Sequence, residues 1–580
     1  MERRGDRSRV GGAVSRRLAR ALSLGALVAL SACTQPAVKT PEASCPPAPF
    51  TAKTDAIVDA WLELTPSWGR AVGLHRYDGR VPAMSRDALA RRVRWVDDTV
   101  RSLKCVTEWS LGPEERLDRA LLLGRLRLER ENLVGRRLPE TDPRFYEELF
   151  DVSGYVNFEY APLAVRAARL VEHEEGALAE APRITENLAP VLSRPVVSTA
   201  IRVYRGYAEY LRGDVASLVR KVGDPPLLER FERANEGLAR AADELARRLE
   251  SEWLPRANDT AHVLGRERYL AFVAAQEGRA VELDAFSQMA EADLAANKAA
   301  YEALAPTVTI TRPKATELVA EATRLMNASR DFLVEKRLVT LPSDERAVVE
   351  ISPPYMRWNA AFLNMPGPFD SVGRGFYYVT LPDPSWPAKE QEEYVFPLGT
   401  LLATTVHEVY PGHFLQGLWV RRAPTRVQRM TDSYSFVEGW AHYVEELMVA
   451  EGFGASDPQN RLGQLSDALL RNCRFVVSIG MHARGMSLAE AERRFVEDCH
   501  QDRAGAREQA IRATFDPGYF AYTLGKLQIR ELRREAEARL GARFDVRAFH
   551  DALLSHGSPP VALVRERVLA DLEATSSAAR

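Results

Sequence analysis

Residues 404–416 read TTVHEVYPGHFLQ and carry the strongest chemical signal in the chain. Within seven residues they place two imidazoles and one carboxylate, those of His407, His413 and Glu408. Zinc accepts neutral imidazole nitrogen and carboxylate oxygen, and a catalytic zinc usually keeps three protein ligands and one water. We therefore interpret this stretch as part of a zinc site.

The spacing of the two histidines predicts a break in the helix that carries them. His407 and His413 are six residues apart, which at about 100° per residue separates them by roughly 240° around a regular helix. One metal ion cannot reach both side chains from such a helix. Proline removes a helical hydrogen bond and glycine tolerates unusual dihedrals, so Pro411-Gly412 is expected to end or bulge the helix and return His413 towards His407.

A third ligand is expected from residues 435–443, SFVEGWAHY. Glu438 is the candidate for this ligand, since zinc accepts a carboxylate oxygen. His442, one helical turn later and therefore on the same face, is an alternative ligand. It could equally hydrogen-bond to a ligand or face water.

The two motifs resemble a known family. HEVYPGHFLQ and EGWAHY are similar to the HExxPGHxxQ and EGWAxY signatures of the domain of unknown function 885 family, whose bacterial members are often lipoproteins and are grouped with gluzincin-type metallopeptidases. The resemblance covers nearly the whole mature chain, since three further blocks match: TPSWGRAVGLHRYDGRVPAMS at 65–85, FDPGYFAYTLGKLQIRELR at 515–533 and FHDALLSHGSPP at 549–560.

This resemblance implies a role for five residues. His407, His413 and Glu438 would be metal ligands, Glu408 the general base, and Tyr522 a hydrogen-bond donor to the transition state. The chain departs from the family pattern at two further positions: His442 stands where an aliphatic residue is common, and Ser478 where an acid is common.

The N-terminus reads as a lipoprotein signal peptide. Seven arginines fall within the first twenty residues, and a short apolar run, residues 21–30, follows them. Leu30-Ser31-Ala32-Cys33 is a lipobox, which predicts removal of residues 1–32 and lipidation of Cys33, so that the mature chain is anchored to the membrane and does not span it. A secreted protein with a chance cysteine is the alternative. Thr34 after the cysteine favours the outer membrane in a Gram-negative host.

Residues 33–50 are rich in Pro, Ala and Thr and predict a flexible tether. We expect a single, mainly α domain over residues 51–580, with an N-terminal helical part at 51–340 and a catalytic part at 341–580. The net charge of −2 argues against a nucleic-acid partner. Export permits disulfides. The pairings nearest in sequence are Cys45 with Cys105 and Cys473 with Cys499, although four cysteines allow three connectivities.

Periodic patterns predict most of the helices. Asp224-Pro225 should cap a helix with an apolar stripe, and the pattern recurs at 314–337, 462–483 and 488–504. Another helix should follow Pro517-Gly518. On it, Tyr522, Lys526, Ile529 and Arg533 fall near one face, which lies either in solvent or over the zinc.

Two β-rich runs, residues 347–351 and 375–381, predict a small sheet next to the metal helix. Residues 375–380 could hold a peptide substrate by main-chain pairing. Buried strand packing explains the same residues equally well.

These groups favour zinc-dependent hydrolysis of short peptides, with Glu408 taking a proton from water and Tyr522, His482 or His442 donating to the oxyanion. No GxSxG segment or phosphate-binding glycine loop competes with this interpretation. A catalytically inactive envelope lipoprotein with a structural zinc, His442 being the fourth ligand, is the alternative. Carboxypeptidase, dipeptidase and oligopeptidase activities all stay open.

Overall fold

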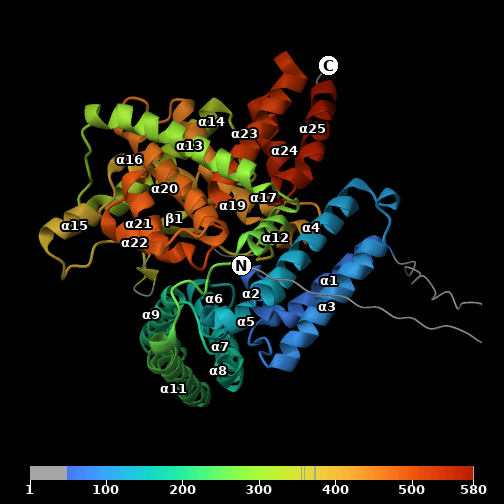
Figure 1. The fold of residues 1–580 in the computed structure, drawn as a ribbon, viewed down its shortest axis with the longest axis vertical. Helices are drawn as coiled ribbons and strands as arrows, with labels where there is room; N and C mark the ends of the chain where they lie inside the picture. The colour runs from blue at the N-terminus through green and yellow to red at the C-terminus, as the bar shows by residue number, and fades with distance from the viewer. Residues whose placement is uncertain (1–48, 354–355, 358, 371–373, 579–580) are drawn as a thin grey trace, which may run out of the picture. The chain divides into compact units, whose positions relative to one another are not determined.

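The computed structural model describes residues 49–353, 356–357, 359–370 and 374–578, which belong to one compact unit, Pro47–Arg580. They form a mainly helical fold with one small sheet, as the sequence predicts (Figure 1). The signal peptide, Cys33, Cys45 and the tether up to residue 48 lie outside the described residues. Phe50, assigned to the tether from the sequence, already begins the first helix. None of the described helices is both long and apolar enough to cross a membrane.

The N-terminal half is built from helices alone. Three of them, α7, α9 and α11, lie side by side (Figure 1) and enclose a hydrophobic core of their own. Helix α11 begins as predicted, because the Asp224 side chain accepts a hydrogen bond from the Leu227 N–H at 3.2 Å. The helices of this half are α1 Phe50–Leu64, α2 Pro66–Ala71, α3 Arg86–Cys105, α4 Pro113–Arg130, α5 Leu138–Thr141, α6 Ser153–Asn157, α7 Leu163–Glu180, α8 Pro182–Asn187, α9 Arg194–Tyr210, α10 Ala216–Val219 and α11 Pro225–Arg248.

The remaining helices include α16, α17 and α19, which carry the His and Glu motifs. Helix α14 confirms the pattern seen at 314–337, and α20 contains the predicted helix at 462–483. The helices of this half are α12 Arg266–Glu277, α13 Leu283–Leu304, α14 Leu318–Lys336, α15 Ala388–Tyr394, α16 Leu398–Glu408, α17 His413–Val420, α18 Arg426–Met430, α19 Tyr434–Ala450, α20 Pro458–Ala483, α21 Leu488–Glu497, α22 Arg503–Ala513, α23 Ala521–Leu540, α24 Val546–Leu554 and α25 Val561–Ala578.

The sheet has the strand order β1-β3-β2. Strands β1 (Val348–Ile351) and β3 (Phe376–Val379) match the two predicted runs, and β2 (Ala361–Asn364) is an addition that the sequence did not reveal. β3 is the central strand, parallel to β1 and antiparallel to β2. Pairing on both sides uses its main-chain groups, so the assignment of residues 375–380 to substrate pairing is wrong, and buried strand packing is the correct alternative.

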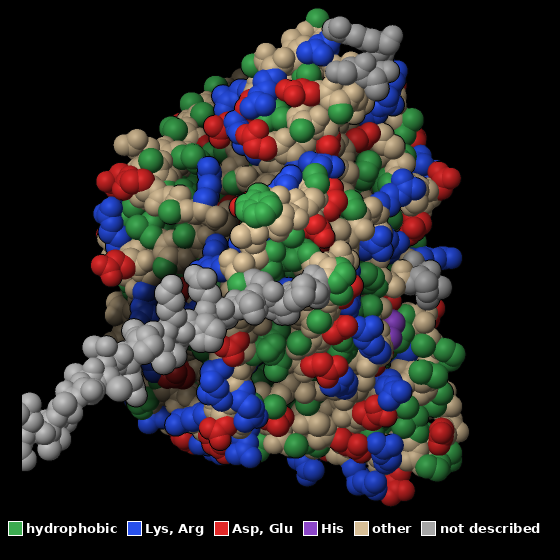
Figure 2. Space-filling view, turned by 90° about the vertical axis from the view of Figure 1, so that its right-hand side faces the viewer, with side chains coloured by type: hydrophobic (Ala, Val, Ile, Leu, Met, Phe, Trp, Pro, Cys, Tyr) green, Lys and Arg blue, Asp and Glu red, His purple; other side chains and the backbone are tan. Residues whose placement is uncertain are grey.

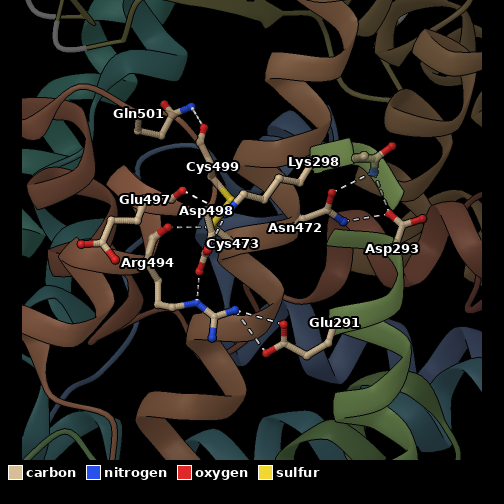
Figure 3. The surroundings of a disulfide bond; sticks show 11 residues. Glu291, Asp293, Lys298, Asn472, Cys473, Arg494, Glu497, Asp498, Cys499 and Gln501 are labelled. Atoms are coloured by element: carbon tan, nitrogen blue, oxygen red, sulfur yellow. Dashed lines mark hydrogen bonds and ion pairs between the residues drawn. A yellow bond between two sulfur atoms is a disulfide. The ribbon is translucent and has the colours of Figure 1, made fainter. Parts of the chain in front are cut away.

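The helix predicted at 488–504 is two helices in the structure, α21 and α22. The segment 488–504 breaks after Glu497, and α22 starts afresh behind Asp502, whose side chain accepts from the Ala504 and Gly505 N–H groups. A disulfide between Cys473 and Cys499 fastens this break to α20 (Figure 3). It is one of the pairings nearest in sequence. Cys105 is also disulfide-bonded.

α23 packs closely on α19 and so buries the face that carries Tyr522 and Lys526. The sequence alone did not decide whether this face lies in solvent. A Cβ atom on Gly525 would meet the Ser435 carbonyl oxygen at 1.7 Å, and one on Gly439 would meet the Gly525 Cα at 2.4 Å, so both positions require glycine. Tyr522, Lys526 and Ile529 are consequently buried. The solvent-facing alternative for this helix is wrong.

The main hydrophobic core does not divide at residue 340. It joins residues from both predicted parts, among them Trp61, Leu122, Leu325, Tyr377, Val406, Trp440, Leu532 and Phe549. Lys and Arg alternate with Asp and Glu over the face drawn in Figure 2, which has no large area of one sign.

Candidate metal centre

The helix that carries His407 breaks where the sequence predicts. α16 ends at Glu408 and α17 begins at His413, with Pro411-Gly412 in the connection. A Cβ on Gly412 would meet the His407 carbonyl oxygen at 1.8 Å, so only glycine lets the chain pass this close to its own preceding turn. The indole N–H of Trp440 donates to the Pro411 carbonyl at 2.8 Å and ties the connection to α19.

The break brings His413 back beside His407, and α19 adds Glu438. One ligand atom from each of the three residues lies within 4.8 Å of the others. Glu438 Oε2 is 3.4 Å from His407 Nε2 and 3.6 Å from His413 Nε2. This oxygen is buried and accepts no hydrogen bond from the described residues. Two imidazole nitrogens and a carboxylate oxygen that converge in this way fit a metal ion such as zinc.

The three groups are coupled electrostatically. Burial disfavours a charged His407, but the Glu438 and Glu445 carboxylates outweigh it and raise the pKa of His407 to about 9. Burial likewise disfavours ionised Glu438, yet the two imidazoles hold the pKa of Glu438 well below its usual range.

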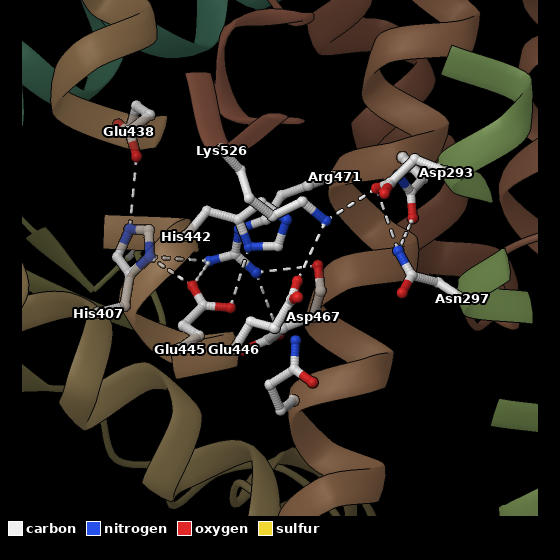
Figure 4. A network of polar contacts seen from close by, with 12 residues as sticks. Asp293, Asn297, His407, Glu438, His442, Glu445, Glu446, Asp467, Arg471 and Lys526 are labelled. Carbon is white, nitrogen blue, oxygen red and sulfur yellow. Dashed lines mark hydrogen bonds and ion pairs between the residues drawn. The ribbon is translucent and has the colours of Figure 1, made fainter. Parts of the chain in front are cut away.

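Glu445 contacts the ring nitrogen of His407 that faces away from Glu438 (Figure 4). Its Oε1 is 2.6 Å from His407 Nδ1, and the Arg471 guanidinium is 3.2 Å from the same oxygen. Arg471 also faces Asp467 at 3.5 Å. Glu445 is fully buried, and Arg471 holds the pKa of Glu445 far below its usual range although burial acts in the opposite direction. A carboxylate on the second ring nitrogen fixes the tautomer that leaves Nε2 for a metal.

His442 belongs to this supporting network. Its Nδ1 lies 3.2 Å from Glu445 Oε2, and burial lowers the pKa of His442 to about 4. Within the described part of the chain, the cluster of converging ligand atoms comprises His407, His413 and Glu438 and does not include His442. His442 does not face water, and it contacts Glu445, the partner of His407, instead of hydrogen-bonding to a candidate ligand directly.

Glu408 points to the sheet side of the centre. Its Oε2 accepts a hydrogen bond from the Leu363 N–H at 2.9 Å. Leu363 lies on β2, the edge strand missing from the sequence prediction. The general-base candidate is thus held by main-chain contact with an edge strand, beside the ligand that precedes it.

Tyr522 contacts Tyr434, the first residue of α19. The two hydroxyl oxygens are 3.4 Å apart, and Tyr434 stands one helical turn before Glu438. Arg512 donates to the Tyr434 hydroxyl at 3.1 Å and lies 3.5 Å from the Tyr522 hydroxyl. Sequence reasoning missed Tyr434 and Arg512. Tyr434 lies on α19 itself, whereas Arg512 lies on α22 and is brought to Tyr434 by the fold.

The structure places His482 elsewhere. It lies on α20 eleven residues after Arg471, about 16 Å further along the helix. Its Nε2 donates to the Ala513 carbonyl at 2.8 Å, and its ring stacks on Tyr269. Ser478, one turn earlier, donates to the Pro517 carbonyl at 2.7 Å. His482 is therefore a core histidine, not a donor to an oxyanion at the metal centre.

A cavity of about 710 Å³ opens beside the ligands. His413 and Glu438 form part of its wall, and Leu363 of β2 forms another part. Other parts of the wall are contributed by α1, α2, α3 and α4 and by the segment after α18, through residues that include Trp61, Trp68, Arg92, Arg125, Glu129 and Asp432. The cavity joins the metal centre to the N-terminal helices.

Comparison with known proteins supplies relatives but no activity. No curated protein matches the chain. A solved structure from Shewanella oneidensis, described as a candidate lipoprotein of unknown function, is 24% identical with a TM-score of 0.74, covering 90% of this chain and 100% of its own. Another, described as a candidate lipoprotein from Colwellia psychrerythraea, is 16% identical with a TM-score of 0.75, covering 90% of this chain and 99% of its own.

These two likenesses concern the fold. The sequence model of one family matches residues 66–568, a span that contains every residue of the metal centre. The chain therefore belongs to that family, which is described as bacterial protein of unknown function, DUF885.

Proposed function

We propose that this protein is a zinc-dependent hydrolase of amide bonds in short peptides. The single observation that carries the proposal is the convergence of His407 Nε2, His413 Nε2 and Glu438 Oε2 beside a cavity, with Glu408 next to a ligand. Three protein ligands are the set typical of catalytic zinc, whereas structural sites close with four.

The residues of the chain divide the remaining work. When bound, zinc supplies a Lewis acid that polarises a carbonyl and makes water more acidic. The Glu408 carboxylate takes the proton of the attacking water and passes it to the leaving amine. Tyr522, held by Tyr434 and Arg512, donates a hydrogen bond to the oxygen on which negative charge develops.

Strand β2 supports a peptide as the substrate. It is an edge strand, it lines the cavity through Leu363, and it contacts Glu408. An extended peptide can pair with such an edge through its main chain. Main-chain pairing with a substrate, which the sequence suggests for residues 375–380, fits β2 instead.

A peptide-library digest read by mass spectrometry tests the proposal. Purified mature protein should bind about one zinc per chain and cleave short peptides, should lose cleavage after chelation, and should regain it with added zinc. Cleavage that survives complete removal of metal would reject the mechanism. Full zinc occupancy without any cleaved peptide would favour the alternative, an inactive envelope protein with a structural zinc.

We further propose that the mature chain is a lipid-anchored envelope protein. Support comes from the lipobox at residues 30–33 and from the description of both structural relatives as candidate lipoproteins. Cys33→Ser should release the protein from the membrane fraction. Unchanged sedimentation of that variant with membranes would mean that another element holds the protein there.

A further inference from the structure

The cavity that His413 and Glu438 line also holds an arginine in its wall, Arg125. Arg125 on α4 stacks over the Trp68 ring with its guanidinium carbon 4.3 Å from the ring centroid, and 5.9 Å from that of Trp61. The two indoles pack edge to face with their ring centroids 4.6 Å apart, and together they form the aromatic surface that Arg125 contacts. Stacking engages the flat face of a guanidinium and leaves the N–H groups in its plane free to bind a planar anion.

No acceptor among the described residues takes up these N–H groups. The nearest carboxylate oxygen, Asp432 Oδ1, is 3.9 Å from Arg125 Nη1, too far for a hydrogen bond, and the Asp432 side chain is 65% exposed. Arg92, in the same cavity, differs: it pairs with Glu129 at 2.6 Å. Within the described residues, Arg125 thus has one long ion pair, to an exposed aspartate, and no hydrogen-bond acceptor.

The other charged groups of the cavity do not duplicate this feature. Arg429 uses its Nε to donate to the Ala423 carbonyl. Glu148 is half-buried and accepts from the Ser67 hydroxyl, and burial raises the pKa of its carboxyl. Among the three arginines that line this cavity, Arg125 is the one that stacks on an aromatic ring, and His413 and Glu438 line the same cavity.

We infer that Arg125 binds the free C-terminal carboxylate of the peptide whose amide bond lies at the metal centre. Arginine and carboxylate match in shape, since two parallel N–H groups donate to two oxygens. The inference rests on the proposed function and narrows it to peptides with a free C-terminus, attacked near that end. Internal segments of long chains, which lack this carboxylate, are poorer ligands.

The test measures binding, so that it can be read whether or not a peptide is hydrolysed. Isothermal titration compares tetra-alanine with tetra-alanine amide on zinc-loaded mature protein carrying Glu408→Gln. The acid should bind about 10- to 100-fold more tightly than the amide, the range expected for one charged, bidentate contact. Arg125→Gln in the same background should abolish this ratio by weakening the acid alone, while the Kd of the amide stays unchanged and serves as a control for folding.

Two further variants sharpen the result. Arg127→Gln removes the same charge from an exposed position on the same helix and should keep the full ratio. Arg125→Lys keeps the positive charge but lacks the two parallel N–H donors of a guanidinium. It should therefore keep only part of the difference in affinity between acid and amide.

An undiminished ratio in Arg125→Gln would overturn the inference, because the carboxylate would then be bound elsewhere, for example by the metal. Equal binding of acid and amide by the parent protein would also overturn it. So would an amide peptide with an internal aspartate that binds as tightly as the free acid, since it would assign Arg125 to side-chain recognition. Failure of the proposed hydrolysis is read separately, in the digest.

Discussion

Glu445 is the residue on which the orientation of the first metal ligand depends. Its carboxylate lies 2.6 Å from His407 Nδ1 and is itself held by Arg471. Removing such a partner from a metal-bound histidine typically costs 10- to 100-fold in metal affinity. Glu445→Gln should weaken zinc binding by about this factor, measured by competition with a chromophoric chelator.

Glu446→Gln is the matched control. Glu446 is the next residue on α19 and faces Lys526 and Arg530 instead of a ligand. The Glu446→Gln variant should bind zinc with the wild-type affinity. Equal zinc affinities in the Glu445 and Glu446 variants would remove Glu445 from the account.

His482 provides the opposite case, a histidine of the core. Burial lowers its pKa to about 3, with His262 and Arg136 facing it. The folded pKa lies below that of the unfolded chain, about 6.5, so the neutral ring contributes stability above pH 6.5 that is lost as the pH falls towards 3. His482→Gln should reduce the pH dependence of the unfolding free energy in this range by at most about 1.4 kcal/mol per pH unit.

The same variant should leave kcat for peptide cleavage near wild type when measured on folded, zinc-loaded protein, because His482 contacts no residue of the metal centre. Urea unfolding at a series of pH values and steady-state rates provide both readouts. A large fall in kcat with unchanged stability would return His482 to the catalytic group.

At the residue scale, the convergence of the three candidate metal ligands was predictable because their signal is local. His407, His413 and the Pro411-Gly412 break lie within one short segment, and Glu438 within a second. Glu445 could have been found too, since it stands seven residues, two helical turns, after Glu438. Tyr434 could have been found in the same way, because it stands one turn before Glu438 on the same helix. Arg125 and Arg512 could not, because their roles arise from contacts between distant helices.

The contact between α19 and α23 is the element on which the position of Tyr522 depends. Gly525 lies three residues after Tyr522 and touches the α19 backbone. Gly525→Ala should push the helices apart, cost about 1 to 3 kcal/mol of stability as overpacking does, and lower kcat more than it raises KM. Thermal unfolding and steady-state kinetics measure these effects.

Gly206→Ala on α9 supplies the control. Gly206 is exposed, and a Cβ there would meet nothing within 4 Å. Alanine should therefore stabilise this helix by about 0.5 to 1 kcal/mol. If the two substitutions had the same effect, the close approach of α23 to α19 would not be a constraint.

At this scale, periodicity predicted the long helices and the two strands with aromatic or β-branched runs. It could not predict β2, whose four residues become a strand only by pairing with β3. It also joined α21 and α22, because their apolar positions continue across the break that Asp502 and the Cys473–Cys499 disulfide create.

The disulfide concerns the whole molecule, because its formation depends on the compartment in which the chain folds. Cys473 and Cys499 are buried and enclose a loop with a sequence separation of 26. The double variant Cys473→Ala, Cys499→Ala should lose about 3 kcal/mol of unfolding free energy, as expected for a loop of this length. Urea unfolding under oxidising conditions measures the difference. Coincident unfolding curves would mean that the bridge contributes nothing to stability.

The molecule as a whole brings the candidate metal centre, from the C-terminal half, to a cavity completed by N-terminal helices. One hydrophobic core joins both halves, in keeping with the single domain expected over residues 51–580. The account assigns different tasks to the two carboxylates nearest the centre, proton transfer to Glu408 and metal binding to Glu438.

The most direct test of this assignment measures zinc content and peptide hydrolysis together on Glu408→Gln and Glu438→Gln. Glu438→Gln replaces an anionic ligand by a weak neutral one and should lose zinc first and activity as a consequence. Glu408→Gln should keep its fold and one zinc per chain while turnover falls about 10²- to 10⁴-fold, the range typical of a lost general base. Near-wild-type turnover by zinc-loaded Glu408→Gln protein would contradict the account.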